Sequence, residues 1–320
     1  MAVTPATTTS AKRSRSKRIG LAIALSVAGL PVVGLPIAAQ TVARLPMAAQ
    51  AGAVERGGYL AAAAGCERCH TDTEHGGWPY AGGRALETAF GTIVAPNITP
   101  DRQTGIGGWS PSDFARAMRW GVAPDASHYL PAFPFAFFNR LSARDLADLE
   151  AFLDSLPAVS QVNRAGDRAP FAAARGAVAS LASRFPGPFQ PDPKQDAVWN
   201  RGAYLVATIG RCGDCHTPRN WLGAPDPDRF LAGAPAGLDG KKVPNITPDP
   251  KTGIGKWTVD DIVGVLTDGD TPDFDFVGGS MAEIVKNTTR LDAADRRAIA
   301  VYLKSLPPVG SASVAAPKKE

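Results

Sequence analysis

Apolar residues recur every three or four positions in several stretches of this chain, which is the spacing of one face of an α-helix. The clearest stretch opens at Ser142 and Asp145, a predicted capping box, and carries apolar residues at 146, 149, 152, 153 and 156. A matching stretch opens at Asp292 and Asp295, with apolar residues at 299, 302, 303 and 306. A proline directly after each stretch, at 157 and at 307, is expected to end the helix.

Further helices are predicted over residues 55–64 and 200–209, and over residues 109–121 and 257–267. The stretches between them are rich in glycine and proline and are expected to be loops. Few strands are expected, so the predicted fold class is all-α.

The chain contains the same series of short motifs twice. The offset between the copies grows only from 145 to 150 residues, so the copies differ by short insertions. A period this long indicates two similar domains in tandem and not a solenoid. The paired motifs are R-G-x-Y-L at 56–60 and 201–205, P-N-I-T-P-D at 96–101 and 244–249, T-G-I-G at 104–107 and 252–255, and L-x-S-L-P at 153–157 and 303–307.

These repeats predict the domain boundaries. The two domains are expected at residues 51–160 and 196–309, with a flexible tail at 310–320. Residues 161–195 are an Ala- and Pro-rich linker, in which residues 171–185 could form one short helix. The prolines at its end indicate a semi-rigid connector.

The first 50 residues have the order of a secretory signal, namely basic, then apolar, then small. Residues 1–18 hold five basic residues, and residues 19–39 are uncharged and mostly apolar. That run is close to the ~20 residues that span a bilayer, although its two prolines disfavour a spanning helix. Two alternatives therefore stay open, a signal peptide cleaved near residues 39–53 or a retained N-terminal membrane anchor. Both place the rest of the chain outside the cytoplasm.

The positive net charge of the chain comes from its first 50 residues. The net charge of +4 would by itself favour a nucleic-acid partner. However, the first 50 residues hold six of the 34 basic residues and none of the 30 acidic ones. The remainder is slightly acidic, and no nucleic-acid partner is expected.

Two C-x-x-C-H pentapeptides, at residues 66–70 and 212–216, use every cysteine of the chain. This motif is the signature of covalent c-type haem attachment. Two thiols three residues apart on a helical turn can reach both vinyl groups of one porphyrin, and the adjacent histidine becomes the proximal iron ligand. The residues concerned are Cys66, Cys69, His70, Cys212, Cys215 and His216. Two covalently bound haem c groups are therefore predicted, with the histidines as metal ligands.

The cysteines have three alternative uses. The first alternative is two structural disulfides without haem. A zinc site is a second, but its pairs are normally about 15–20 residues apart, whereas Cys66 and Cys212 are 146 apart. A thioredoxin-like redox motif is the third, and it needs neither the histidine nor a second copy.

The order of these motifs over residues 55–309 resembles class I cytochrome c domains in tandem, and more narrowly the multi-haem cytochrome c subunits of bacterial periplasmic or membrane-bound dehydrogenases. The resemblance implies two domains, each a few helices wrapped around a covalently attached haem. It implies an electron-transfer protein, not an enzyme, in the periplasm or on the periplasmic face of the inner membrane. Its donor would be a dehydrogenase and its acceptor a quinone, a cytochrome or a terminal oxidase of the respiratory chain, with a membrane surface as a further contact.

Domains of this family usually place a methionine over the distal face of the iron, and Met/His ligation raises the haem potential. Met281 is the only methionine after the second attachment motif and is the predicted ligand of the second iron. The corresponding position in the first copy is Phe133, which has no donor atom for iron. The first haem is then five-coordinate or takes another ligand. The candidates are His128, Met118 and His75, of which His128 is nearest in sequence.

Two functions follow from these observations. The first is a dihaem electron carrier in which electrons enter at the first haem and leave from the second. The alternative is a dihaem enzyme, a peroxidase or an oxyanion dehydrogenase, that uses an open or atypically ligated first haem. The chain has only four histidines, two of them assigned to haem, which argues against acid–base catalysis by imidazole.

Overall fold

The computed structural model describes residues 47–88, 91–130, 132–166, 187–219, 225–235, 237 and 241–310. These residues belong to one compact unit, 45–320. Residues 1–46 of the predicted signal or anchor, the whole predicted linker helix at 171–185 and the tail beyond residue 310 lie outside them. None of the described helices is both long enough and apolar enough to span a bilayer.

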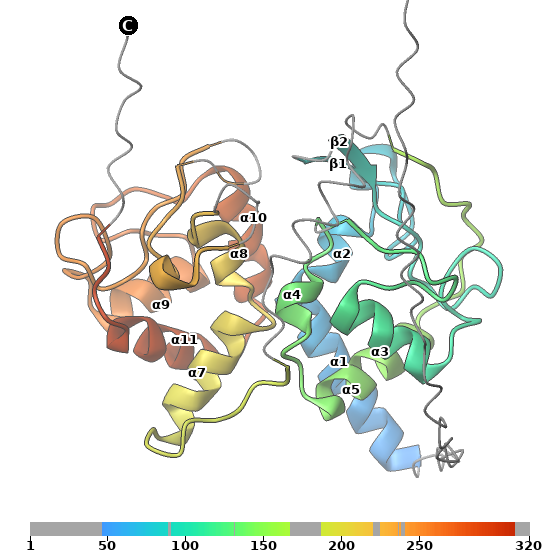
Figure 1. The fold of residues 1–320 in the computed structure, drawn as a ribbon, viewed down its shortest axis with the longest axis horizontal. Helices are drawn as coiled ribbons and strands as arrows, with labels where there is room; N and C mark the ends of the chain where they lie inside the picture. Colours follow the sequence, from blue (N-terminus) through green and yellow to red (C-terminus); the bar gives the residue numbers. More distant parts are fainter. Residues whose placement is uncertain are drawn as a thin grey trace, which may run out of the picture. The chain divides into compact units, whose positions relative to one another are not determined.

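The described residues are mainly helical, as the sequence predicts, with one small hairpin (Figure 1). The hairpin pairs β1, Ala85–Thr88, with β2, Gly91–Val94, in antiparallel register. The remaining elements are α1 Met47–Ala64, α2 Cys66–Cys69, η1 Thr73–His75, α3 Pro111–Trp120, α4 Phe135–Phe138, α5 Ala143–Ser155, α7 Ala197–Ala207, α8 Cys212–His216, η2 Pro227–Arg229, α9 Val259–Thr267, α10 Gly279–Thr288 and α11 Ala293–Ser305.

Two pairs of crossing helices form the frame, α1 with α5 and α7 with α11 (Figure 1). The glycine of each R-G-x-Y-L motif makes the crossing possible. A Cβ on Gly57 would lie 1.9 Å from the carbonyl oxygen of Asp148, and one on Gly202 would lie 2.0 Å from that of Ala298. Only a residue without a side chain allows the two backbones to approach so closely. The repeated glycine is therefore a packing requirement of the helix pair.

The boundaries of α3 and α9 lie within two residues of the predicted ones. Ser110 and Asp113 form a complete capping box before α3, and Thr258 and Asp261 form one before α9. In α3 a proline occupies the first turn and Gly121, in the left-handed conformation, ends the helix. Local caps thus account for the starts of both helices and for the end of α3.

The caps of α5 and α11 differ from the prediction. Ser142 accepts from the backbone N–H of Asp145, but the Asp145 carboxylate does not return the bond, because it accepts from the hydroxyl of Tyr204. The N–H of Ser142 donates to the same hydroxyl at 3.3 Å. Asp292 provides no side-chain cap to α11. The capping box at Ser142 is thus half-formed, since a tyrosine from α7 takes the place of the reciprocal bond.

The corresponding contact, with the roles of the two repeats exchanged, occurs at α11. The hydroxyl of Tyr59, from α1, donates to the Asp295 carboxylate at 2.6 Å and accepts from the N–H of Asp292 at 3.1 Å. Each R-G-x-Y-L tyrosine therefore caps the C-terminal helix of the other repeat. We call these two sets of contacts the tyrosine clasps, one made by Tyr59 and one by Tyr204.

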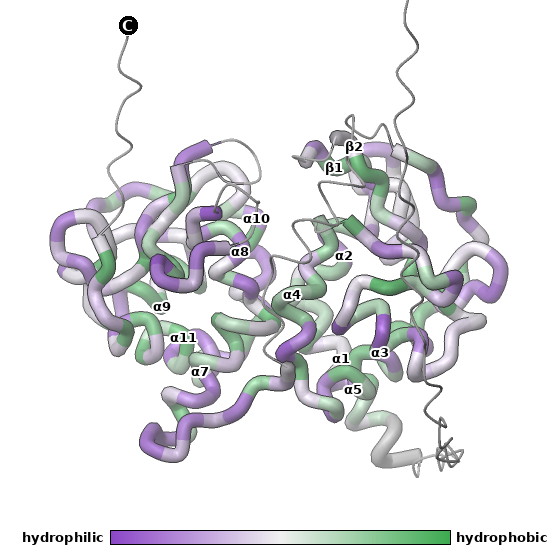
Figure 2. The backbone as a smooth tube through the Cα atoms, in the orientation of Figure 1, coloured by the Kyte–Doolittle hydropathy of each residue, from purple (hydrophilic) through white to green (hydrophobic). Residues whose placement is uncertain are grey.

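The core consists of the inward faces of these helices. Leu60, Leu149, Leu205 and Ile299 are among its buried members. Figure 2 shows apolar segments along α1, α4 and α9, and polar segments mainly in the loops. Helix α1 begins at Met47, eight residues before the predicted start, while α4 and α10 were not predicted from periodicity.

Candidate haem-binding sites

Each C-x-x-C-H motif forms one short helical turn. Helix α2 follows Gly65, at φ 67°, and α8 follows Arg211, at φ 49°, so a left-handed residue turns the chain into each motif. Residues i and i+3 of a helix lie on one face, which places the two thiols of each motif together. All four cysteines are free and partly buried. Each turn therefore carries its two thiols on one face.

The two histidines are held in the same way. Nδ1 of His70 lies 2.7 Å from the carbonyl oxygen of Pro96, and Nδ1 of His216 lies 2.8 Å from that of Pro244. A carbonyl oxygen only accepts, so Nδ1 carries the proton and Nε2 keeps its lone pair. Burial lowers the pKa of both imidazoles, which keeps them neutral. Both rings therefore offer Nε2 as a metal ligand.

The proline carbonyl belongs to the repeated P-N-I-T-P-D motif, which is itself anchored. The side-chain oxygen of Asn97 accepts from the N–H and hydroxyl of Thr99, and its amide donates to the carbonyl of Val159 at 2.7 Å. Asn245 makes the same bonds to Thr247 and, at 2.7 Å, to Val309. The buried asparagine thus ties the histidine-orienting loop to the segment that follows each C-terminal helix.

These residues fit a covalently bound haem. The donor set at each motif is two thiols for thioether bonds and one imidazole with a free Nε2. Burial raises the pKa of the Cys66 and Cys212 thiols to about 12, whereas redox-active C-x-x-C pairs have lowered thiol pKa values. Within the described ranges no three His, Cys, Asp or Glu side chains gather as a metal-binding group. The raised thiol pKa values argue against the thioredoxin-like interpretation.

The two attachment motifs contact each other. Arg211, which precedes Cys212, donates through Nη2 to the carbonyl of Ala64, two residues before Cys66, at 3.1 Å. Its guanidinium also lies 5.6 Å from the ring centroid of Phe138 and 3.5 Å from Asp214. Arg211 therefore joins the start of the second motif to the start of the first.

Two further contacts support this junction. Arg290 lies 3.5 Å from Glu67 of the first motif. A Cβ on Gly65 would lie 2.5 Å from the side-chain nitrogen of Asn287, on α10. The first motif is thus packed against the helix that carries Met281.

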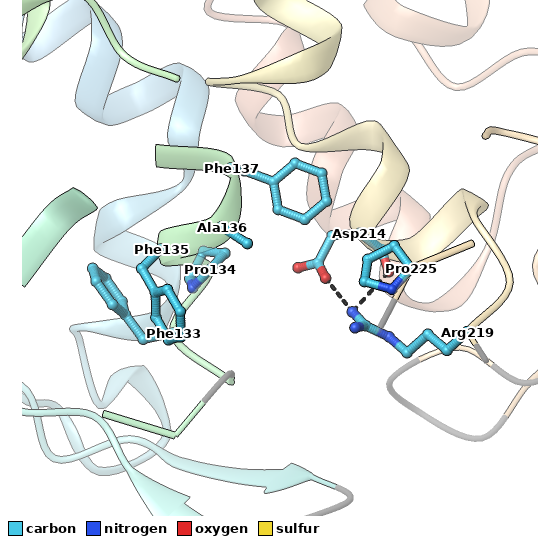
Figure 3. Close-up of a pocket in the computed structure, with 8 residues that line it drawn as sticks. All are labelled: Phe133, Pro134, Phe135, Ala136, Phe137, Asp214, Arg219 and Pro225. Atoms are coloured by element: carbon cyan, nitrogen blue, oxygen red, sulfur yellow. Dashed lines mark hydrogen bonds and ion pairs between the residues drawn. The ribbon is translucent and has the colours of Figure 1, made fainter. Parts of the chain in front are cut away.

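A small cleft lies beside the second motif (Figure 3). One wall is the loop and helix from Phe133 to Phe137, and the other is formed by Asp214, Arg219 and Pro225. Arg219 donates to Asp214 at 2.5 Å within this second wall. The region expected to hold a distal ligand of the first haem therefore borders the attachment turn of the second.

No family model matches the chain, but its resemblance to individual proteins is clear. A diheme cytochrome c-type protein of Cereibacter sphaeroides is 42% identical over 266 residues, which cover 81% of this chain and 87% of the relative. The chain belongs to the dihaem c-type cytochromes. As a member of this family it is an electron-transfer protein and not a catalytic enzyme.

Other relatives of this cytochrome are parts of dehydrogenases. One of the subunits of nicotinate dehydrogenase from Pseudomonas putida is 41% identical over 83% of this chain and 22% of the relative. The fructose dehydrogenase cytochrome subunit of Gluconobacter japonicus is 36% identical over 87% of this chain and 57% of the relative. The cytochrome thus spans between about a fifth and three fifths of the length of these two relatives.

The predicted distal residues lie in different settings. Met281 is the third residue of α10 and is half-buried. Phe133 packs against the core, with its ring edge-on to Tyr129 at 5.6 Å and tilted on Phe138 at 5.7 Å. The positions differ in kind, since one carries a thioether on a helix and the other a ring within an aromatic cluster.

The three candidates for the first iron are also separated in the fold. Met118 lies on α3 in the hydrophobic core, like its counterpart Leu266. The imidazole of His75 is exposed, with Nδ1 2.9 Å from the Asp72 carboxylate. His128 is exposed in a loop, where its backbone pairs with Val122.

Sequence reasoning missed three parts of these sites. The carbonyls of Pro96 and Pro244 orient the histidines, but a backbone oxygen has no sequence signal beyond the repeat of its motif. Arg211 was not singled out, because nothing in its local sequence indicates a contact with Ala64. The clasps of Tyr59 and Tyr204 were also missed, although both tyrosines stand in a repeated motif.

Proposed function

We propose that this cytochrome carries two covalently bound haem c groups and transfers electrons from a periplasmic or membrane-bound dehydrogenase to the respiratory chain. The acceptor would be a quinone, another cytochrome or a terminal oxidase. The proposed attachment residues are Cys66 and Cys69 for one haem and Cys212 and Cys215 for the other. The names of the dehydrogenase-associated relatives support the donor class.

The observation that carries the proposal is the pair of histidines. His70 and His216 present Nε2 in the same way, because each donates Nδ1–H to a proline carbonyl at 2.7 or 2.8 Å. Such a second bond fixes the ring and raises the basicity of the ligating nitrogen. The same arrangement in both repeats supports one haem per repeat, and with it the proposed domains at 51–160 and 196–309.

When bound, each haem would supply an iron that carries one electron. The chain's own residues would hold the two groups apart from bulk water and at a fixed separation. Arg211 fixes the two attachment turns against each other through Ala64, and the clasps of Tyr59 and Tyr204 hold the surrounding helices. A rigid junction of this kind suits electron transfer between two fixed sites.

The two sites should differ in potential. Met281 is the proposed distal ligand of the second iron, and methionine ligation raises the potential. Phe133 offers no donor atom to the first iron, whose distal side would be open or taken by another residue such as His128. We therefore propose that electrons enter at the first haem and leave from the second. The basic-then-apolar N-terminus supports a periplasmic location, as a free protein or at the membrane surface.

A potentiometric titration of the purified protein tests this order. The expected result is two one-electron steps at separate potentials. In the variant Cys66→Ala/Cys69→Ala only the higher step should remain, and in Cys212→Ala/Cys215→Ala only the lower one. A single step, two equal potentials or the opposite assignment of the steps would contradict the proposal.

A further inference from the structure

Two phenylalanines are exposed on the loop before α10. Phe274 is 99% exposed and Phe276 is 70% exposed. Large apolar side chains stabilise a protein by leaving water, so Phe274 contributes nothing to folding in this way and Phe276 contributes little. Phe274 also has φ 60°, a left-handed conformation that disfavours residues with a Cβ. The exposure of both rings therefore needs an explanation other than folding.

The loop is nevertheless well defined. The N–H of Thr271 donates to the carbonyl of Asp275 at 2.8 Å, that of Phe274 to Thr271 at 3.0 Å, and that of Val277 to Gly269 at 2.9 Å. Asp270 and Phe276 form a backbone bridge. The two rings are thus displayed by a hydrogen-bonded loop.

The first repeat contains the same loop without the rings. The N–H of Ala123 donates to the carbonyl of Ser127 at 2.9 Å, that of Ala126 to Ala123 at 3.0 Å, and that of Tyr129 to Gly121 at 2.7 Å. Ala126 has φ 64°, close to that of Phe274. In sequence, Ala126 stands where the second loop has Phe274, and His128 stands where it has Phe276. The backbone therefore forms this loop with alanine at the exposed corner, and the phenylalanines are a feature of the second repeat alone.

The charges of the second loop indicate what would cover the rings. Asp268, Asp270, Asp273 and Asp275 are all exposed, and no lysine or arginine lies between residues 268 and 280. The first loop has a single acid, Asp125, over the corresponding positions. A partner for this surface must offer an apolar depression for the rings and a basic rim for the four carboxylates. Two copies of this chain would repel each other here, as would an anionic lipid surface.

We propose that the loop of residues 268–276, the acidic aromatic loop, docks a basic protein that exchanges electrons with the second haem. This inference rests on the proposed function, because it needs the second haem as the electron exit. The loop ends five residues before Met281, the proposed distal ligand, so a protein bound there would stand close to that haem. The carboxylates would speed encounter and the rings would hold the complex.

Stopped-flow oxidation of the reduced full-length protein tests the proposal. The probe is a lysine-rich ferric mono-haem cytochrome c, with the same protein after succinylation of its lysines as the charge control. The second-order rate constant for the wild type should fall steeply with ionic strength, and succinylation should abolish that dependence.

The variant Phe274→Ala/Phe276→Ala should lower the rate constant about tenfold, as expected for the loss of interface anchors. Ala126 shows that this loop accepts alanine at the corner. The variant Asp273→Asn/Asp275→Asn should flatten the salt dependence. The matched change Asp125→Asn in the first loop should leave the rate constant and its salt dependence unchanged. All variants should keep the wild-type haem potentials.

Unchanged rates in both loop variants, or a wild-type rate independent of salt, would overturn the proposal. A second outcome would also overturn it: the wild type binds phosphatidylcholine–phosphatidylglycerol vesicles, the phenylalanine variant does not, and the two transfer electrons at the same rate. That outcome would assign the rings to a membrane. Failure of the proposed function looks different, because the wild type itself would then carry no haem or fail to reduce the probe.

Discussion

Removal of the Tyr59 hydroxyl tests whether the tyrosine clasps hold the two repeats together. In Tyr59→Phe, the Asp295 carboxylate loses a donor at 2.6 Å and the N–H of Asp292 loses an acceptor at 3.1 Å. Burial and the bond to Asp295 raise the pKa of Tyr59 to about 12, so the hydroxyl is a donor throughout the neutral range. The contact is therefore present under ordinary conditions.

The expected loss can be worked from these two bonds. A hydrogen bond to a charged group contributes about 1.5–3 kcal/mol. Asp295 keeps both bonds from Arg201, and the exposed N–H of Asp292 can bond to water, so the lower part of that range applies. We expect the free energy of unfolding to fall by about 1.5–2 kcal/mol. The Tyr204→Phe change, which removes the partner of Asp145, should act similarly.

The assay is urea unfolding of the haem-loaded protein, followed by circular dichroism. Tyr129→Phe is the control, because the Tyr129 ring is partly buried in an edge-on contact with Phe133, while its hydroxyl makes no hydrogen bond to the described residues. A loss in Tyr59→Phe below about 0.5 kcal/mol, the range of ordinary surface changes, or equal to that of the control, would refute the clasp.

Three further predictions concern packing, ligation and pH. Gly57→Ala should cost about 3 kcal/mol or more, because its Cβ would meet backbone at 1.9 Å, whereas Gly58→Ala, whose Cβ would meet a ring at 3.2 Å, should cost far less in the same urea assay. Met281→Ala should lower the potential of one haem only and remove the near-infrared signal of methionine ligation from the ferric spectrum; an unchanged spectrum would exclude Met281 as a ligand. Burial alone would raise the pKa of Asp295, but hydrogen bonds from Arg201 and Tyr59 outweigh it and lower that pKa. The contribution of this carboxylate to the free energy of unfolding is therefore full above the unfolded pKa of ~3.9 and is lost as pH falls through the folded value. Because Asp295→Asn lacks this contribution, its acid unfolding should begin at higher pH than that of the wild type.

Much of the fold could be predicted because its signals are local. Ser110 with Asp113 and Thr258 with Asp261 place the starts of α3 and α9 through bonds within one turn. The half-formed box at Ser142 could not be predicted, because the competing partner, Tyr204, lies 59 residues from Asp145 in sequence. Helix α4, of four residues, is too short for a periodic signal.

The candidate site likewise has features that the sequence predicts and features that it does not. The cysteines and histidines stand out because covalent attachment requires a fixed spacing, which a sequence displays directly. The orienting carbonyls of Pro96 and Pro244, and the contact of Arg211 with Ala64, depend on how distant segments pack. A sequence without an alignment holds no record of such contacts.

The intact mass of the purified protein tests the central claim most directly. The account predicts the mass of the polypeptide plus two haem groups, with no free thiol, and plus one haem group in each of the variants Cys66→Ala/Cys69→Ala and Cys212→Ala/Cys215→Ala. A wild-type mass with one haem or none, or four thiols that still react with a thiol reagent after unfolding, would contradict it.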